Sequence, residues 1–144
     1  MDNISVDKAI FTTRSMRRLR PDPVPREDIE HIVEAATMAP SAGNYQMWAF
    51  VAVTDETIRK KIGAAYRESG NSYIRDTVLV DPSTDAERLR VYGKAMYTVE
   101  HLAEAPVIIV ACSTLAIPND SAIAAGPFGS LFPAIQNLML AARG

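Results

Sequence analysis

Four arginines within seven positions, with a serine among them, form the sharpest chemically competent cluster in the chain. They are Arg14, Arg17, Arg18 and Arg20, and Ser15 follows the first. A guanidinium group binds phosphate oxygens through two parallel hydrogen bonds, and a serine hydroxyl adds a further one. The cluster therefore predicts a local site for a small phosphate-bearing ligand. The competing interpretation is a solvated basic turn whose arginines pair with the acids of residues 27–34.

A polar loop at residues 41–47 is the second candidate site. It carries Ser41, Asn44 and Gln46 between an expected helix and an expected strand. Amide side chains present paired donors and acceptors, which suit the edge of a planar heterocycle with ring nitrogens and carbonyls. We expect these three side chains to contact such a ligand. Gly43 and Asn44 are also common turn residues, so an ordinary turn is the alternative.

Two adjacent amides, Gln136 and Asn137, interrupt an otherwise apolar stretch near the end of the sequence. Buried amides need hydrogen-bond partners. We expect them to bond neighbouring backbone or loop groups, and the alternative is that they line an interface or a cofactor pocket. Trp48, which follows the polar loop, is expected in the core rather than as a stacking plate.

The elements that position these residues follow from hydrophobic spacing and from capping residues. The expected helices are one after Ser5 ending near Thr13, one opened by Pro25 and stopped by Pro40, one capped by Asp55 and ended by a loop at 70–72, one from about Asp85 to Ala103, and one over Pro133–Arg143. Alternation predicts a strand at Trp48–Val53. The apolar run Val107–Ala111 predicts a second strand, buried on both faces.

Further loops are expected at 81–83 and 117–129, around a middle region with weak periodicity. Two strands alone rarely form a stable sheet in water. We therefore expect something else to complete the core: a third strand in the middle region, a partner subunit, or chain after Gly144.

The composition is that of an ordinary globular protein. The chain has 144 residues, of which 48% are hydrophobic and 22% charged, so we expect a single domain over residues 1–144. A net charge of −2 offers no general attraction to nucleic acid or to an anionic membrane. The longest apolar run, 106–112, is too short to span a bilayer, and no secretory signal opens the sequence. These features predict a cytoplasmic protein.

Several site classes find no support in the sequence. The single cysteine, Cys112, and the two histidines, His31 and His101, lack metal-ligand spacing, so we expect structural roles for all three and no metal site. The glycine-rich motifs that bind dinucleotides or nucleoside triphosphates are absent, as is the serine motif of α/β-hydrolases. Hydrolase and nucleoside-triphosphatase functions are therefore disfavoured.

Taken in order along nearly the whole chain, five segments resemble the FMN-dependent nitroreductase family. They are residues 14–19, 23–25 with the helix that follows, 39–48, 106–110 and 133–143. The resemblance implies an α+β fold with a central, mainly antiparallel sheet flanked by helices. It also implies an intertwined homodimer with FMN at each of two subunit-interface sites, and NAD(P)H as the electron donor.

Carried over position by position, the family's phosphate and ribityl contacts fall on Arg14, Ser15 and Arg17 or Arg18. The loop contacts fall on Ser41, Asn44 and Gln46. The implied reaction is a ping-pong hydride transfer through the flavin to a nitroaromatic or quinone-like small-molecule acceptor. It requires no acid or base side chain, and we assign none.

Two departures from the family pattern stand out. Met47 replaces the proline that usually precedes the tryptophan. Family members also continue past the helix that carries Gln136 and Asn137, so we expect this chain to lack the C-terminal segment, as a fragment or as a shortened member. The alternatives are therefore a flavin-binding module without turnover and, more weakly, a nucleic-acid module built on residues 14–20.

Overall fold

The computed structural model describes residues 4–81, 83–115 and 121–144. The chain forms two compact units. The first unit consists of Met1–Arg14, Val24–Ala52 and Ile109–Gly144, and the second of Ser15–Pro23 and Val53–Ile108. Helices and paired strands occur together, as expected for an α+β protein.

Helices α1 (Val6–Thr12) and α2 (Arg26–Thr37) of the first unit begin where the sequence indicates. The Ser5 hydroxyl accepts a hydrogen bond from the Lys8 amide at 3.2 Å, which satisfies one free donor of the first turn. Pro25 precedes α2, whose first turn carries Glu27 and Asp28 next to the positive end of the helix dipole. Both predicted starts are confirmed.

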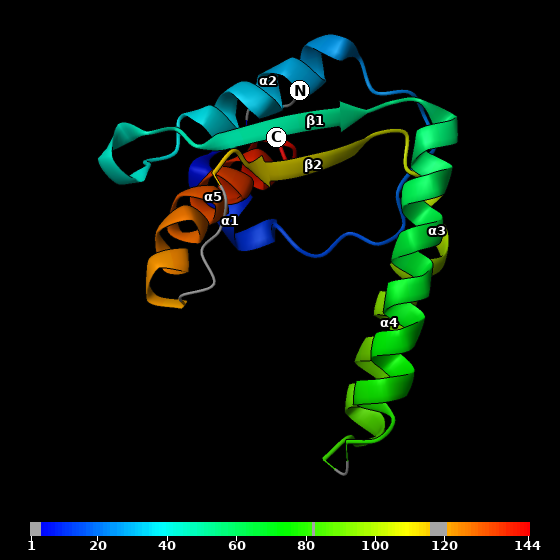
Figure 1. Ribbon diagram of the computed structural model, residues 1–144. Coiled ribbons are helices and arrows are strands. Elements are labelled where there is room, and N and C mark those ends of the chain that lie inside the picture. The colour runs from blue at the N-terminus through cyan, green and yellow to red at the C-terminus, as the bar shows by residue number, and fades with distance from the viewer. Residues whose placement is uncertain (1–3, 82, 116–120) are drawn as a thin grey trace. The chain divides into compact units, whose positions relative to one another are not determined.

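Strands β1 (Trp48–Val53) and β2 (Ile108–Ser113) pair in a sheet of the first unit and run in opposite directions (Figure 1). Beyond their ends, the Thr114 amide donates to the Met47 carbonyl at 2.9 Å, which places Val51 opposite Val110. Val51 is 52% exposed and Val110 38% exposed. The expectation that the second strand is buried on both faces is therefore wrong for this chain, because Val110 is exposed on the face that it shares with Val51.

The opposite face of the sheet packs on helices. Ala36 at the end of α2 and Ala134 of α5 (Ser121–Ala141) are fully buried, and Trp48, Phe50 and Leu138 pack against them. Trp48 and Phe50 alternate along β1 and so share one face. The predicted core position of Trp48 is confirmed.

The last helix starts well before the predicted residue Pro133. Residues 121–129, expected as loop, are the first turns of α5, whereas 117–120 lie outside the described residues. The sequence favours a loop here because glycine and proline, found at 126, 127 and 129, usually mark loops. Packing of α5 against α2, with Leu131 and Ala134 buried, stabilises the helix despite its two prolines.

The second unit is built on α3 (Glu56–Tyr73) and α4 (Ala86–His101), which lie side by side (Figure 1). The predicted caps Asp55 and Asp85 each accept a backbone hydrogen bond three residues on. The expected loop at 70–72 is wrong, because α3 continues through it and runs on as the π-helix η2 (Ile74–Val78). A Cβ at Gly70 would lie 2.8 Å from both γ-carbons of Val99, so this glycine permits a close helix contact rather than a turn.

The short helix η3 (Leu102–Glu104) follows α4 and is tied to α3 by one arginine. The Arg59 Nη1 atom donates to the carbonyls of Ala103 and Ala105, and its Nε donates to the Thr54 carbonyl. Half-buried, this guanidinium provides donors for three backbone carbonyl oxygens.

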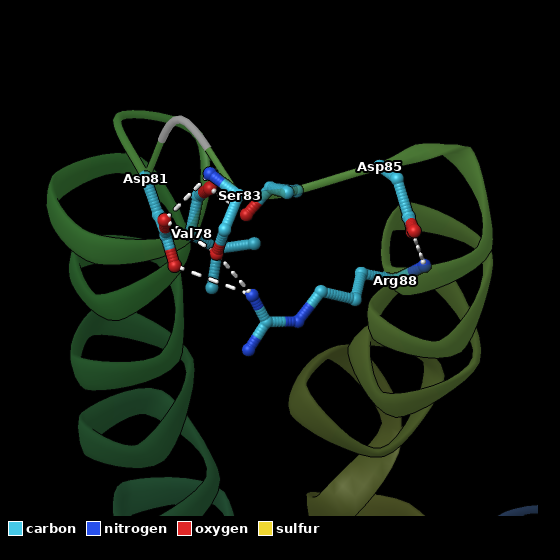
Figure 2. Close-up of polar contacts among 6 residues, drawn as sticks. Val78, Asp81, Ser83, Asp85 and Arg88 are labelled. Carbon is cyan, nitrogen blue, oxygen red and sulfur yellow. Dashed lines mark hydrogen bonds and ion pairs between the residues drawn. The ribbon is translucent and has the colours of Figure 1, made fainter.

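The turn between η2 and α4 is held by a polar network, shown in Figure 2. Asp81 accepts from both the backbone amide and the hydroxyl of Ser83, at 2.8 and 2.7 Å, and from Arg88 at 3.3 Å. The Ser83 hydrogen bonds, with a smaller contribution from Arg88, lower the pKa of the Asp81 carboxyl. Asp81 and Ser83 confirm the predicted turn, and position 82 lies outside the described residues.

Candidate functional site

Two arginines of the segment, Arg14 and Arg17, bind backbone carbonyls and no carboxylate among the described residues. Arg14 donates to its neighbouring Thr13 carbonyl at 2.7 Å, and Arg17 donates to the Ser15 carbonyl at 3.3 Å. In the described residues neither arginine forms an ion pair. Arg14, which shares the first unit with the acids at 27–34, forms no ion pair with them among the described residues, and Glu30 binds Arg26 at 2.6 Å.

The remaining arginines of the segment have different environments. Arg20 pairs with Asp22 at 3.4 Å, on the surface. The Arg18 guanidinium carbon lies 5.1 Å from the centre of the Tyr97 ring, within cation–π distance. Arg18 is thereby directed toward α4, whereas Arg17 stays beside Ser15.

The polar loop has an unusual backbone. The short helix η1 (Ala42–Asn44) opens it, and φ is positive at Gly43 (58°), Asn44 (55°) and Gln46 (50°). For residues with a side chain this conformation costs about 1–2 kcal/mol each. Two non-glycine residues held this way within three positions are more than an ordinary turn requires.

Hydrogen bonds within the loop offset that strain and orient its side chains. The Ser41 hydroxyl accepts from the Gln46 amide at 3.0 Å, and the Gln46 Nε2 donates to the Asn44 Oδ1 at 3.0 Å. The two exposed amides therefore form a fixed pair that leaves the Asn44 Nδ2 and the Gln46 Oε1 for a ligand.

Ser130 supports this loop from α5 and was missed in the sequence. Its hydroxyl accepts from the Ala42 amide at 3.1 Å and donates to the Gly126 carbonyl at 3.2 Å. It is only 4% exposed. The available signal was a single hydroxyl within an apolar segment, which must find a partner when it is buried.

The seven predicted cofactor-binding residues are divided between the two units. Arg14, Ser41, Asn44 and Gln46 belong to the first unit, whereas Ser15, Arg17 and Arg18 belong to the second. Within the first unit, none of the hydrogen bonds between described residues joins Arg14 to the loop. The single chain thus presents two groups of polar side chains, each organised by its own local contacts.

A basic hollow of about 560 Å³ lies in the second unit, between the arginine segment and α4. Its lining residues are Met16, Arg17, Arg18, Arg90, Gly93, Lys94 and Tyr97. The residues of α4 were not predicted as site residues from the sequence, although Arg90, Lys94 and Tyr97 follow the spacing of one helix face. The hollow carries four positive side chains and no acidic one.

An apolar hollow of about 600 Å³ lies in the first unit against α1, α2 and α5. None of the seven predicted residues lines it. His31 and Asn137 do, and the Asn137 Nδ2 donates to the Ala35 carbonyl at 3.3 Å, which confirms the expected structural bond. Gln136 is exposed.

Neither a metal-binding cluster nor a membrane-spanning helix occurs in the described residues. The described part of the chain contains no group of three or more potential metal-ligating side chains. His101 bonds Glu104 at 2.8 Å and stacks on Tyr97, and Cys112 is a half-buried free thiol of β2. No helix within the described ranges combines the length and apolar character needed to cross a membrane.

Comparison with known proteins places these features in a wider group. The sequence pattern described as the nitroreductase family matches residues 10–144. A protein of Archaeoglobus fulgidus named as an NADH dehydrogenase or NAD(P)H nitroreductase is 34% identical over 113 residues, which are 76% of this chain and 62% of that protein. The iodotyrosine deiodinase of Danio rerio is 30% identical over 97 residues, 67% of this chain and 32% of that protein.

A solved structure shares the fold. Oxidised iodotyrosine deiodinase, bound to FMN and 3-iodo-L-tyrosine, superposes with a TM-score of 0.74 at 21% identity, over 96% of this chain and 69% of that one. The chain thus spans less than two thirds of the curated relatives reported above and just over two thirds of the solved structure.

Proposed function

The chain belongs to the nitroreductase family, and on that premise we propose that it is an FMN-dependent oxidoreductase that uses NAD(P)H to reduce a small-molecule acceptor. The resemblance seen in the sequence and the expected nitroreductase-like fold are both confirmed. The names of the relatives, an NAD(P)H nitroreductase among them, support the choice of donor.

One observation carries the proposal at the level of residues, and it is the geometry of the polar loop. Asn44 and Gln46 hold left-handed backbone conformations, and their side chains form a fixed amide pair on the surface. Strain of this kind persists where the surrounding structure maintains it, and it clusters at ligand sites. An amide pair with one free donor and one free acceptor suits the edge of the flavin ring.

The phosphate end of FMN is assigned to Arg14, Ser15 and Arg17. Arg14 and Arg17 are without carboxylate partners among the described residues, so a phosphate would not have to displace an ion pair. Of the alternatives Arg17 and Arg18, contact with Tyr97 engages Arg18, which favours Arg17. These groups supply charge-assisted hydrogen bonds, whereas Ser41 binds through its hydroxyl and holds the loop.

When bound, FMN supplies hydride transfer from NAD(P)H to the acceptor in a ping-pong cycle. The chain's own residues would bind the cofactor and orient it. The arginine segment neutralises the phosphate, and the amide pair fixes the ring edge through donors and acceptors that are already in place. Ser130 keeps the loop in register by accepting from the Ala42 amide. No side chain is assigned a proton-transfer role.

A homodimer is the proposed active form. The first unit exposes large apolar side chains, among them Phe11 at 73%, Met38 at 70% and Phe132 at 60%. A partner subunit that covered these side chains would remove apolar surface from water, which favours association. A dimer would also let the arginine segment of one subunit and the loop of the other contact the same flavin.

The acceptor divides the proposal into two testable forms. A nitroaromatic or quinone-like acceptor is the primary candidate, and reductive dehalogenation of an iodotyrosine is the second, favoured by the relatives named iodotyrosine deiodinase. Steady-state oxidation of NAD(P)H with each acceptor, together with iodide release, separates them. The non-catalytic alternative, a flavin-binding module, predicts retained FMN with neither reaction.

The deciding experiment is FMN retention by the purified chain. The protein is mixed with FMN and desalted, and its visible spectrum and its dissociation constant are measured. We expect Arg14→Gln and Asn44→Ala to weaken FMN binding, the former about ten- to hundredfold, since a hydrogen bond to a charged group contributes about 1.5–3 kcal/mol. Lys61→Gln and Asn71→Ala, exposed positions on α3, are the matched controls.

The outcomes are distinct. Retention of flavin that both site variants reduce and both controls preserve supports the assignment. A folded, dimeric chain that does not bind FMN would overturn the assignment. Equal losses in the site variants and the controls would show that the assigned residues have no special role.

A further inference from the structure

The basic hollow of the second unit concentrates positive charge that the described residues leave largely unpaired. Its lining carries four cationic side chains, although the whole chain has a net charge of −2. Arg90 reaches Glu87 only at 4.0 Å, across the surface of α4. Lys94 forms no ion pair within the described residues. Like charges grouped in this way repel one another unless an anion neutralises them.

The hollow also has a fixed wall. The Tyr97 ring stacks on His101, with ring centres 4.2 Å apart and planes at 24°, while Arg18 lies over Tyr97. Both contacts orient the cluster, and His101 is itself bonded to Glu104 at 2.8 Å. Arg18 is thereby held near Arg90 and Lys94, which extend from the helix that carries Tyr97.

Gly93 leaves space for a ligand in the middle of this face. A Cβ built there would meet nothing within 4 Å, so packing does not require a glycine. Glycine inside a helix is unfavourable relative to alanine, by about 1 kcal/mol. At this position it keeps the backbone of α4 open toward the hollow that Arg90 and Lys94 line.

We propose that Arg18, Arg90 and Lys94, arranged around Tyr97, form a second phosphate-binding site that takes the phosphoryl groups of the nucleotide electron donor and favours NADPH over NADH. This inference rests on the proposed function, which supplies the donor. The site would give α4 a part in binding the donor, through Arg90 and Lys94.

Charge matching favours the donor with the additional phosphate. The pyrophosphate of NADH carries about two negative charges, and the 2′-phosphate of NADPH adds about 1.5–2 more. Three cations besides Arg17 exceed what a pyrophosphate needs and suit the larger charge. The base of the nucleotide does not stack on Tyr97, since Arg18 and His101 already contact that ring.

The test compares a charge-removing variant with a matched control. The double variant Arg90→Gln/Lys94→Gln removes two positive charges from the hollow, and Gly93→Glu places a carboxylate inside it. The matched control is Lys61→Gln, which removes an exposed positive charge of α3. The FMN-loaded protein is titrated calorimetrically with adenosine 2′,5′-bisphosphate and with 5′-AMP. The KM and kcat for NADPH and NADH are measured separately.

We expect both hollow variants to weaken bisphosphate binding at least tenfold, and to weaken 5′-AMP binding less, because 5′-AMP lacks the 2′-phosphate. The KM for NADPH should rise at least tenfold, more than that for NADH, while kcat and FMN retention stay within twofold. Lys61→Gln should match the unmodified chain in every readout. Circular dichroism spectra establish that the variants are folded, and Gly93→Ala, which adds a methyl group but no charge, should lose less affinity for the bisphosphate than Gly93→Glu.

Several results would overturn the inference. These are unchanged bisphosphate binding in folded variants, equal losses for NADPH and NADH, or a parallel loss of FMN, which would assign the hollow to the flavin phosphate instead. Failure of the proposed function is recognised separately, since an unmodified chain that retains no FMN and oxidises no donor would exclude the enzyme. Bisphosphate binding that depends on Arg90 and Lys94 would then still support a phosphate site.

Discussion

Two glycines of the second unit allow the helix packing to be tested with one substitution made in opposite environments. Gly63 of α3 is buried, and a Cβ there would lie 2.7 Å from the Ala103 Cβ and 3.1 Å from the Ala103 amide nitrogen. Because one of these neighbours is backbone, the contact cannot be relieved by turning a side chain. Gly93 of α4 has nothing within 4 Å of the same position.

The expected magnitudes follow from this difference. Alanine gains about 1 kcal/mol of helix propensity at either site. Overpacking at Gly63 costs about 1–3 kcal/mol. The propensity gain is common to both variants and cancels in their comparison, so Gly63→Ala should be about 1–3 kcal/mol less stable than Gly93→Ala. The free energy of unfolding of Gly93→Ala should be about 0.5–1 kcal/mol higher than that of the unmodified chain.

Urea unfolding, followed by far-ultraviolet circular dichroism, measures both free energies of unfolding. The dependence on urea concentration should be the same in the three proteins, so that the midpoints report stability alone. Equal stability of the two variants, or a more stable Gly63→Ala, would refute the close approach of α3 to η3.

Three further predictions concern single contacts. Arg59→Lys should destabilise the chain by about 1–3 kcal/mol in urea unfolding, because one ammonium cannot serve the carbonyls of Thr54, Ala103 and Ala105 together. Gln46→Gly should raise the unfolding midpoint by relieving a positive φ, yet weaken FMN retention in the desalting assay, since the amide pair with Asn44 is lost. The pKa of Asp81 is lower in the folded than in the unfolded chain, so its stabilising contribution is present above the unfolded pKa, about 4. It is lost as pH falls through the folded value, and Asp81→Asn should flatten the decline of unfolding free energy below about pH 4.

Helix starts were predictable because their signals are local. Ser5, Asp55 and Asp85 each accept a backbone hydrogen bond three residues on, as capping chemistry requires. The strand Trp48–Val53 was predicted at its observed bounds, because alternation and β-branched composition lie within the segment itself. Helix ends and interruptions were less predictable. Gly70 and Gly126 read as loop signals, yet both lie inside helices.

The reason for these errors is that glycine has two uses that a sequence does not distinguish. At Gly70 it allows Val99 to approach α3, whereas at Gly43 it permits a positive φ. Only the neighbour in space decides between them, and that neighbour is 29 residues away along the chain at Gly70.

The candidate site shows the same division. Residue types alone predicted a phosphate-binding site at the arginine segment and amide contacts to a ligand at the loop. The hydrogen-bonding capacity of guanidinium and amide groups does not depend on where in the fold they lie. The contact of Arg18 with Tyr97 was not predictable, since that ring comes from a helix far along the chain. Ser130 was missed for the same reason, as its partner Ala42 is 88 positions away.

The sequence by itself determined where the capped helices begin, where the strand Trp48–Val53 runs and which side chains can bind an anion or a planar ring, because capping, periodicity and side-chain chemistry are local properties. Only the tertiary structure decided which cations meet at the basic hollow, where the loop backbone turns left-handed, and that Val51 and Val110 remain exposed on the sheet. Those features depend on contacts between residues distant in sequence, and no local pattern records them.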